Sequence, residues 1–485
     1  MSYFYKESNV MPPLTPALKD ALISQSIVYV FGAGITSSLT GRNYGWWNWI
    51  IDGIQHIKDT DAAEELESSI KTDDSAENLI KVVGDVIIHT KEDGTYDDWM
   101  QGAFESAEII NDEIVHALNI LNLPQDIFVT TNYDSYLEEA TRTGILTRAD
   151  SGKIFEMIDS GSCSSVVHIH GAYSSKEHID NIVASQEQYD ELYSDEGAQF
   201  IQNLLGTRSL IFIGCGKTTD DKNIAHFIRF ACEHLNLDVP YFYLKKEGDE
   251  APELPDHFHI IDYGKDYCNL PGFLEEIALF RNRMLTDKMP IIGRTIRTDS
   301  ESLGEYHYAN EKLGFVGRKA ELNFLGAFLK DSRRILWQAI TGQGGSGKSR
   351  LAYEFLKEND HEWFGFFWND AATLSDIESF KPFCNTIVVI DYIKGREKNV
   401  AEWMHALFGK FSLTDFKLRL LLLERESDKG AGSWFSELEN EWGKFDRALF
   451  SKAAFSTEFL NLADLDDDSV SSLIGEVREA NGLPH

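Results

Sequence analysis

The feature that most constrains the fold is a recurring pair of a short apolar strand and a glycine or polar loop. Residues 27–31 are apolar and run directly into Gly32, Ala33 and Gly34. A buried strand is therefore expected to end in a loop whose backbone a ligand can approach closely. Further strands are predicted at residues 127–130, 165–171, 209–213, 240–244 and 259–264. Helix-compatible sequence alternates with them, which predicts an α/β fold with a doubly wound parallel sheet.

Polar side chains accompany the glycines at these strand ends. Ligands bind at the carboxyl edge of an open parallel sheet, and Asn132, Asp134 and His170 are expected at that edge. A histidine there can accept a proton, and a glycine loop before a helix suits a nucleotide phosphate. The residues alone leave other interpretations open: a structural turn for the loop, helix capping for Asn132 and Asp134, and a buried structural role for His170.

Length and charge exclude several classes of protein. At 485 residues and 43% hydrophobic content the chain can form two or three domains. A formal net charge of −34 argues against a general nucleic-acid binder. No apolar run is long enough to span a membrane and no secretion signal is recognisable, so we expect a cytoplasmic protein. The five cysteines include no Cys-x-x-Cys pair, which argues against a zinc ribbon or a disulfide framework.

Domain boundaries are expected where these patterns break. Residues 1–285 are predicted to form the first domain, and residues 52–123, which are rich in helix-forming residues, a helical insertion within it. Residues 286–310 contain proline, glycine and several Ser and Thr residues without periodicity, which favours a linker. Residues 311–485 are predicted to form the second domain.

The second domain contains a complete phosphate-binding loop. Residues 342–349 read Gly-x-x-x-x-Gly-Lys-Ser and lie between an apolar strand at 334–340 and a helix at 350–357. That context is typical of a P-loop, whose backbone N–H groups hold nucleotide phosphates. The second domain is therefore predicted to be an α/β P-loop NTPase, with Lys348 reaching the terminal phosphates.

Two later strands carry the expected partners of this loop. The apolar segment 386–390 ends in Asp391, which we expect to hold Mg²⁺ together with Ser349. Tyr392 follows where many ATPases have an acidic residue, so slow hydrolysis is expected. The strand that begins at residue 418 ends beside Arg425, which suits a terminal phosphate or, alternatively, a surface ion pair.

Four motifs in the first half resemble the sirtuin family, in the same order and at strand ends. They are residues 32–36, 131–134, 168–171 and 214–218. Sirtuins bind NAD with a Gly-Ala-Gly loop, a segment containing Asn and Asp, a His-Gly pair and a loop rich in Gly, Thr and Ser. The resemblance covers about residues 20–270 and implies a Rossmann-like, NAD-binding domain.

Carried onto this chain, the resemblance implies roles for individual residues. His170 becomes the catalytic base, Asn132 lies beside the nicotinamide ribose, and Asp134 lies near the carboxamide. The other residues implied at the NAD site are Gly32, Ala33, Gly34, Thr36, Gly214, Thr218 and Tyr263.

Two departures from the family bear on the reaction. Protein-deacylating sirtuins carry four zinc cysteines in two Cys-x-x-Cys pairs and an Asp-Phe-Arg segment after the first glycine loop, and this sequence has neither. Water is then the simplest acceptor, and hydrolysis of NAD to ADP-ribose and nicotinamide is expected. The alternatives are a non-catalytic sensor of NAD or ADP-ribose and, thirdly, a protein deacylase.

The second domain resembles the STAND class of signalling ATPases over about residues 311–485. The resemblance is carried by residues 315–318 (Phe-Val-Gly-Arg), the P-loop, Asp391, Arg425 and the Gly-Leu-Pro at 482–484. It implies an ATP site formed by Gly342, Gly344, Gly345, Gly347, Lys348, Ser349, Asp391, Arg425 and Pro484, with Mg²⁺ on Ser349 and Asp391. STAND proteins continue into a winged helix and a sensor, so we expect a longer polypeptide, or alternatively a sensor on another chain.

Together the two resemblances imply a bacterial antiphage protein. NAD hydrolysis by the first domain would be controlled by ATP-dependent self-assembly of the second, and NAD depletion would halt the infected cell. The partners implied are further copies of the chain, which form a homo-oligomer, and a phage-encoded protein trigger. Neither a nucleic acid nor a membrane is expected as a partner.

Overall fold

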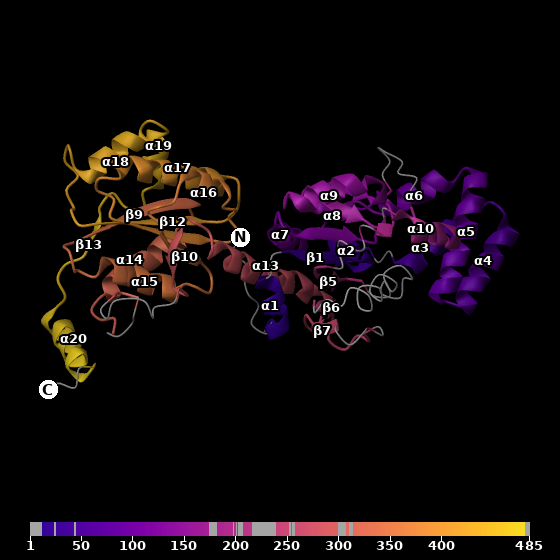
Figure 1. The fold of residues 1–485 in the computed structure, drawn as a ribbon, viewed down its shortest axis with the longest axis horizontal. Helices are drawn as coiled ribbons and strands as arrows, with labels where there is room; N and C mark the ends of the chain where they lie inside the picture. The colour runs from indigo at the N-terminus through magenta and orange to yellow at the C-terminus, as the bar shows by residue number, and fades with distance from the viewer. Residues whose placement is uncertain are drawn as a thin grey trace. The chain divides into compact units, whose positions relative to one another are not determined.

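In the computed structural model the chain divides into two compact units, Met1–Arg281 and Asn282–His485 (Figure 1). The structure describes residues 12–23, 26–42, 45–173, 182–196, 198–199, 201, 207–215, 239–251, 254, 258–298, 307–309 and 314–480. Thr218 and Pro484, both expected at nucleotide sites, lie outside these residues. Within them, no helix combines the length and the apolar character needed to cross a membrane.

A seven-stranded parallel sheet forms the centre of the first unit, in the order β3-β4-β2-β1-β5-β6-β7. Its strands are β1 (Ile27–Phe31), β2 (Ile127–Thr130), β3 (Gly144–Thr147), β4 (Ser165–His168), β5 (Ser209–Ile213), β6 (Tyr241–Lys245) and β7 (Phe258–Asp262). This confirms the predicted α/β, Rossmann-like sheet. Because β2 and β5 flank β1, the strand order reverses beside β1, where open sheets of this kind form a crevice for ligands.

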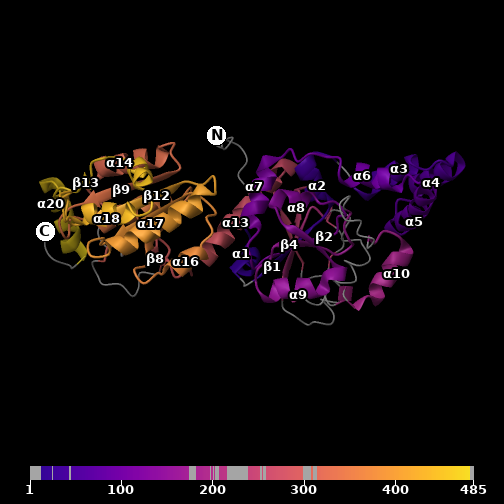
Figure 2. The ribbon, with the colours of Figure 1, turned by 90° about the horizontal axis from the view of Figure 1, so that it is seen from above.

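Helices cover both faces of this sheet. Helices α2 (Ala33–Thr40), α7 (Asp112–Leu121) and α8 (Tyr136–Thr141) lie on one face, and α9 (Ser151–Asp159) lies on the other (Figure 2). All five residues of β1 are buried for this reason. Strand β3 was not expected from the sequence, because it is a four-residue edge strand that begins with an exposed glycine.

The residues predicted as a helical insertion are helical in the structure. They include the end of α3 (Trp46–Gln55), α4 (Thr60–Thr72), α5 (Ala76–Asp93), α6 (Tyr96–Phe104) and α7. Helices α3 to α6 gather at one end of the first unit (Figure 1) around a stacked pair of indole rings, Trp49 and Trp99, with centroids 5.1 Å apart. Helix α7 packs instead against α2 and α8.

A buried ion pair joins the beginning and the end of the first unit. Arg281, on α13 (Leu270–Thr286), donates to both carboxylate oxygens of Asp126, over 2.7 and 2.5 Å. Asp126 also accepts the N–H of Ile27 at 2.9 Å, and Arg281 donates to the carbonyl of Leu22 at the end of α1 (Pro16–Ile23). Burial by itself lowers the pKa of Arg281, but the charge and the hydrogen bonds of Asp126, together with the nearby Tyr29, raise it overall.

The second unit contains a six-stranded sheet in the order β13-β9-β12-β11-β10-β8. Its strands are β8 (Ile292–Thr295), β9 (Ile335–Thr341), β10 (Phe364–Trp368), β11 (Thr386–Asp391), β12 (Leu418–Glu424) and β13 (Leu460–Asn461). All neighbours are parallel except β8, which runs antiparallel to β10.

Part of the predicted linker therefore belongs to this sheet. Residues 292–295 form β8 and pair with residues 366–368 of β10, although residues 286–310 were expected to connect two domains. The sequence gives little warning, because a short strand that contains Gly293 and Arg294 lacks apolar periodicity. The unit boundary also falls earlier than residue 285, within α13.

Helices flank the second sheet on both sides (Figure 1). Helices α14 (Lys319–Lys330) and α15 (Lys348–Glu358) cover one face. The other face is covered by α16 (Leu374–Glu378), α17 (Glu397–Ser412), α18 (Trp434–Trp442) and α19 (Arg447–Ala453). The last described helix, α20 (Asp467–Ala480), meets the loop before α14, where Glu476 accepts the N–H of Gly314 at 2.5 Å.

Removing one partner of the buried ion pair should destabilise the first unit strongly. We expect Arg281→Met to cost roughly 3–5 kcal/mol of unfolding free energy, because it leaves the Asp126 charge buried without its partner. Lys71→Met is the matched control, since Lys71 pairs with Glu67 on the exposed surface of α4 and should contribute less than about 1 kcal/mol. Urea unfolding of the full chain measures both. Equal effects of the two substitutions would contradict a structural role for the pair.

Candidate functional site

Two glycine loops touch at the crevice between β1 and β5. The N–H of Gly34 donates to the carbonyl of Gly214 at 2.9 Å, and that of Gly32 to the carbonyl of Ile213 at 3.0 Å. A Cβ on Gly32 would lie 2.5 Å from the Cα of Cys215, and a Cβ on Gly34 would lie 2.8 Å from the Cα of Gly214. The loops can therefore meet only because these positions lack side chains.

This contact changes what the first loop offers a ligand. A glycine loop suits a phosphate through its open N–H groups, yet the N–H of Gly32 already donates to the end of β5 and that of Gly34 to the second loop. Helix α2 begins at Ala33, without a side-chain cap, so its amino-terminal end still lies at the crevice. A helix amino terminus carries partial positive charge and suits an anion.

A chain of polar side chains connects this loop to the end of β2. The Asn132 amide donates to the hydroxyl of Thr36 at 3.0 Å and to the carbonyl of Gly32 at 3.2 Å. The Thr36 hydroxyl donates to the carboxylate of Asp134 at 2.9 Å. Burial raises the pKa of Asp134 to about 6. The structure thus brings together three residues that the sequence placed at one site.

His168 connects the backbone of Asn132 to the carboxylate of Glu138. His168 at the end of β4 is fully buried, with Nε2 at 2.5 Å from a carboxylate oxygen of Glu138 and Nδ1 at 2.8 Å from the carbonyl of Asn132. Burial by itself lowers the pKa of His168, but the charge and hydrogen bond of Glu138 outweigh burial and raise it. Glu138 was missed from the sequence because it lies in a helix with nothing to distinguish it from its exposed neighbour Glu139.

His170 lies in a segment held beside the end of β2. Backbone hydrogen bonds run from Ile169 to Thr130 at 3.1 Å and from Tyr173 to Tyr133 at 2.8 Å. The His170 side chain is only 2% exposed, and its ring meets that of Tyr189 edge-on at 5.7 Å. A ligand that reaches this imidazole must enter a covered space.

Tyr263 is the most distant of the described residues expected at the NAD site. It follows β7 and is buried, and its N–H donates to the carbonyl of Lys245 at 3.0 Å. Strand β7 is the third strand from β1, which corresponds to roughly 14 Å across the sheet. The structure therefore does not bring Tyr263 to the glycine loops.

In the second unit the loop after β9 has the conformation that its glycines permit. Gly342, Gly345 and Gly347 have φ values of +152°, +85° and +91°, which residues with side chains rarely adopt. Lys348 donates to the carbonyls of Gly342 and Gln343 at 2.7 and 3.0 Å, so its ammonium group lies over the loop.

The expected partners of this loop lie against it. Ser349 donates to the carboxylate of Asp391 at 2.7 Å, and the guanidinium of Arg425 lies next to Gly344, 3.8 Å from the position of a Cβ there. Burial raises the pKa of Asp391 and lowers that of Lys348. The ring of Tyr392, at 5.5 Å, lies below Arg425, which favours a role at the loop over a surface ion pair.

Arg318, from the Phe-Val-Gly-Arg segment, also binds the loop after β9. Its guanidinium donates to the carbonyl of Ser346 at 3.0 Å and to that of Ala463 after β13 at 2.9 Å. It also pairs with Glu321 at 2.9 Å. Arg318 therefore positions the loop.

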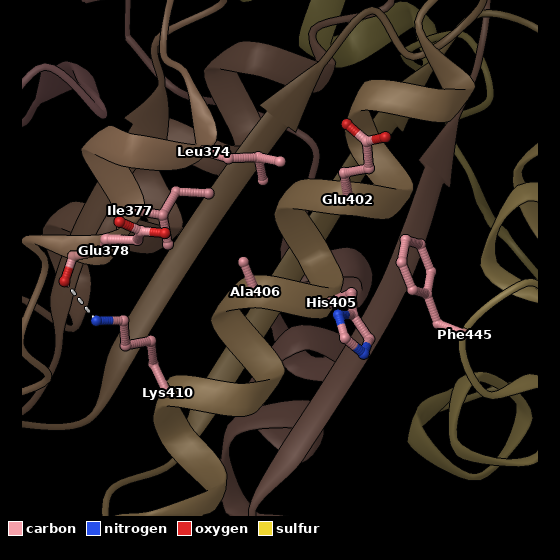
Figure 3. A pocket seen from close by; sticks show the side chains of 8 residues that line it. All are labelled: Leu374, Ile377, Glu378, Glu402, His405, Ala406, Lys410 and Phe445. Carbon is pink, nitrogen blue, oxygen red and sulfur yellow. Dashed lines mark hydrogen bonds between the residues drawn. The ribbon is translucent and has the colours of Figure 1, made fainter.

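The groove shown in Figure 3 lies elsewhere in the second unit. It has a volume of about 330 Å³ and is lined by residues of α16 and α17 together with Phe445, whose ring stacks on His405 at 4.3 Å. Lys410 crosses one end and donates to the carbonyl of Glu378 at 2.5 Å. None of the residues that line it comes from the strand ends.

Comparison with known proteins shows a similarity in the first unit. Residues 126–260 match the family described as the SIR2-like domain. The first unit is SIR2-like over these residues. The matched residues include Asn132, Asp134, His170 and Gly214, whereas the first glycine loop precedes them and Tyr263 follows them.

Three curated proteins are similar over a short stretch. They are uncharacterized proteins of Mycobacterium bovis and of two strains of Mycobacterium tuberculosis, each 44% identical over 63 residues. That stretch is 13% of this chain and 15% of each relative. The chain therefore spans only a small part of the curated relatives that it matches.

The contact between the glycine loops of the first unit can be tested with one methyl group. Gly34→Ala should destabilise the domain by about 1–3 kcal/mol, because the added Cβ meets backbone atoms of Gly214. Gly102→Ala is the control, since Gly102 also lies in a helix, α6, but has open space around it and should be neutral or slightly stabilising. Thermal unfolding compares the two. An equal effect would mean that the loops do not touch.

The buried carboxyl of Asp134 predicts a specific pH dependence. Its pKa rises from an ordinary value of 3.8 to about 6 on folding, so the folded state binds more protons between these values. Stability should therefore fall as pH rises through this window, by about 3 kcal/mol. Asp134→Asn should remove that loss while keeping an acceptor for Thr36. Urea unfolding at several pH values tests this, and a constant difference between the two proteins would contradict it.

Proposed function

We propose that the first unit hydrolyses NAD to ADP-ribose and nicotinamide. The observation that carries the proposal is that the glycine loop, the Asn132–Thr36–Asp134 chain and the His170 segment lie at the carboxyl ends of neighbouring strands, in a unit that is SIR2-like over residues 126–260. Glycines for close approach, a side-chain amide and a buried imidazole are the groups that this reaction needs.

The residues have distinct roles in this proposal. The amino terminus of α2 faces the pyrophosphate, and the Asn132 amide orients the nicotinamide ribose. The bond from C1′ to the nicotinamide nitrogen breaks as positive charge develops on the ribose, and nicotinamide leaves with the electron pair. Water then attacks C1′, and His170 accepts the proton that water loses. Burial of the site excludes bulk water and strengthens these interactions.

The burial of His170 also supports a second candidate, a sensor that binds NAD or ADP-ribose without turnover. A base that is 2% exposed reaches a substrate only if the residues around it move. A sensor would use the same loops and the same amide but would release no nicotinamide.

We propose that the second unit binds ATP and Mg²⁺ as a STAND-class P-loop NTPase. The residues around the loop suit a metal–triphosphate. Lys348 over the loop and Arg425 beside Gly344 would contact the terminal phosphates, and the hydrogen-bonded pair Ser349–Asp391 would hold the metal. Mg²⁺ would bind to Ser349 and Asp391, whose oxygens are ligands that it prefers, and would neutralise phosphate charge.

We further propose that ATP-dependent self-assembly of this unit controls the NAD hydrolase. In this scheme the protein acts in the bacterial cytoplasm, a phage-encoded protein triggers assembly, and NAD depletion stops the infected cell. The proposal rests on the joint presence of the two sites on one chain, because a nucleotide-gated effector needs both.

Nicotinamide release from NAD tests both halves of the proposal. Wild-type protein assembled with ATP and the trigger should release nicotinamide, and His170→Ala and Asn132→Ala should each lower the rate by about 10²-fold or more. Lys348→Ala should bind NAD normally but lose activation by ATP, because the lysine contacts only the second site.

The outcomes separate the alternatives. NAD binding without release in any assembled state would favour the sensor. Unchanged release by His170→Ala would contradict the proposed base, and release by Lys348→Ala at the wild-type rate would contradict control by ATP.

A further inference from the structure

Glu424 is a buried carboxylate at the proposed nucleotide site of the second unit. It is the last residue of β12, the strand between β9, which leads into the P-loop, and β11, which ends in Asp391. In the register of the sheet Glu424 lies beside Thr341, the residue immediately before Gly342, and its neighbour Leu423 lies beside Asp391. The backbone of Glu424 is thus placed between the two halves of the site.

The direction of its side chain follows from strand alternation. Leu421 and Leu423 belong to the core beneath α14 and α15, as do Ile387 and Val389. Asp391 lies two residues after Val389, so its side chain is on the same face of the sheet and reaches Ser349 on α15. Glu424 directly follows Leu423, so its side chain lies toward the opposite face. The two carboxylates therefore approach the end of the loop from opposite faces of the sheet.

Many ATPases use the residue after the magnesium aspartate to activate water, and that position is filled here by Tyr392. Tyr392 has a φ of +56°, is 55% exposed and leaves the strand direction. A side chain that continued β11 would lie on the face that Glu424 occupies. Glu424, on the neighbouring strand, has a carboxylate on the face where β11 has none.

The contacts of Glu424 hold it in place without using all its acceptor sites. One carboxylate oxygen accepts the N–H of Arg425 at 2.6 Å, and the other accepts the N–H of Lys394 at 2.8 Å. A carboxylate has about four acceptor sites, so two remain for a water molecule. Its negative charge acts on both Lys348 and Asp391, which places it within electrostatic reach of the phosphate and metal positions.

We propose that Glu424 is the carboxylate that holds and deprotonates the attacking water when the second unit hydrolyses ATP. The proposal rests on the nucleotide site proposed above. The oxygen of water forms a bond to the γ-phosphorus while the bond from that phosphorus to the β–γ bridging oxygen breaks. ADP leaves with the bonding electrons, and the proton passes from water to Glu424 and then to solvent. The products are ADP and inorganic phosphate.

Glu424→Gln in the full chain tests this, with Glu426→Gln as the matched control. Glu426 lies two residues further on, is half-exposed and pairs with the Lys394 ammonium at 2.6 Å. Three quantities are measured for each protein: binding of a non-hydrolysable ATP analogue, the melting temperature, and phosphate release from ATP under single-turnover conditions. The nucleotide that remains bound is then extracted and identified as ATP or ADP.

We expect Glu424→Gln to bind the analogue and to melt like wild type, to release phosphate about 10²-fold more slowly, and to retain ATP where wild type retains ADP. Glu426→Gln should match wild type in every measurement. Phosphate release by Glu424→Gln at the wild-type rate would overturn the proposal. So would a joint loss of analogue binding and melting temperature, which would show that Glu424 only holds the two backbone N–H groups.

Failure of the nucleotide site itself has a different signature. If wild-type protein does not bind the analogue, the proposed ATP site is wrong and the role of Glu424 falls with it. If wild type binds the analogue and never releases phosphate, the ATP site stands and only the role of Glu424 is overturned.

Discussion

The first unit depends on the buried ion pair between Asp126 and Arg281. Asp126 accepts hydrogen bonds from both Arg281 and the N–H of Ile27, so one carboxylate ties the start of β1 to the start of β2 and to α13. With Val28 beside Ile127, the parallel register brings Phe31 beside Thr130 at the other end. Gly32 and Asn132 then follow from adjacent strands, and the Asn132 amide can reach the Gly32 carbonyl. The interaction at one edge of the sheet thereby sets the geometry of the site at the other.

The candidate sites of the two units are assembled in similar ways. In each, parallel strands deliver to one edge of the sheet residues that are far apart in the chain. A hydroxyl in the first turns of a helix donates to an aspartate from another segment, as Thr36 donates to Asp134 and Ser349 to Asp391. Burial raises the pKa of both aspartates, so each is sensitive to a ligand that brings positive charge or a hydrogen bond. The common feature is a carboxylate held near a strand end by a hydroxyl from a helix.

The sequence predicted those parts of the fold and the candidate site that rest on local pattern. Buried strands such as β1, β5 and β11 are continuous apolar runs, and the loops that follow them contain glycines at positions that need positive φ or close approach. Strands β3 and β8 escaped prediction because short edge strands are recognisable mainly from their partners. Glu138 escaped because burial, which distinguishes it from Glu139, is not a property of its local sequence.

By itself the sequence determined the α/β class of the first unit and its two glycine-rich strand ends, and the P-loop motif of the second unit. These features depend on residue type and on spacing over short distances in the chain. Only the tertiary structure decided that the two glycine loops touch, that His168 pairs with Glu138 beneath Asn132, and that Glu424 lies between the P-loop and Asp391. The physical reason is that hydrogen bonding and burial between segments far apart in the chain follow from the order and register of the strands, which no short stretch of sequence contains.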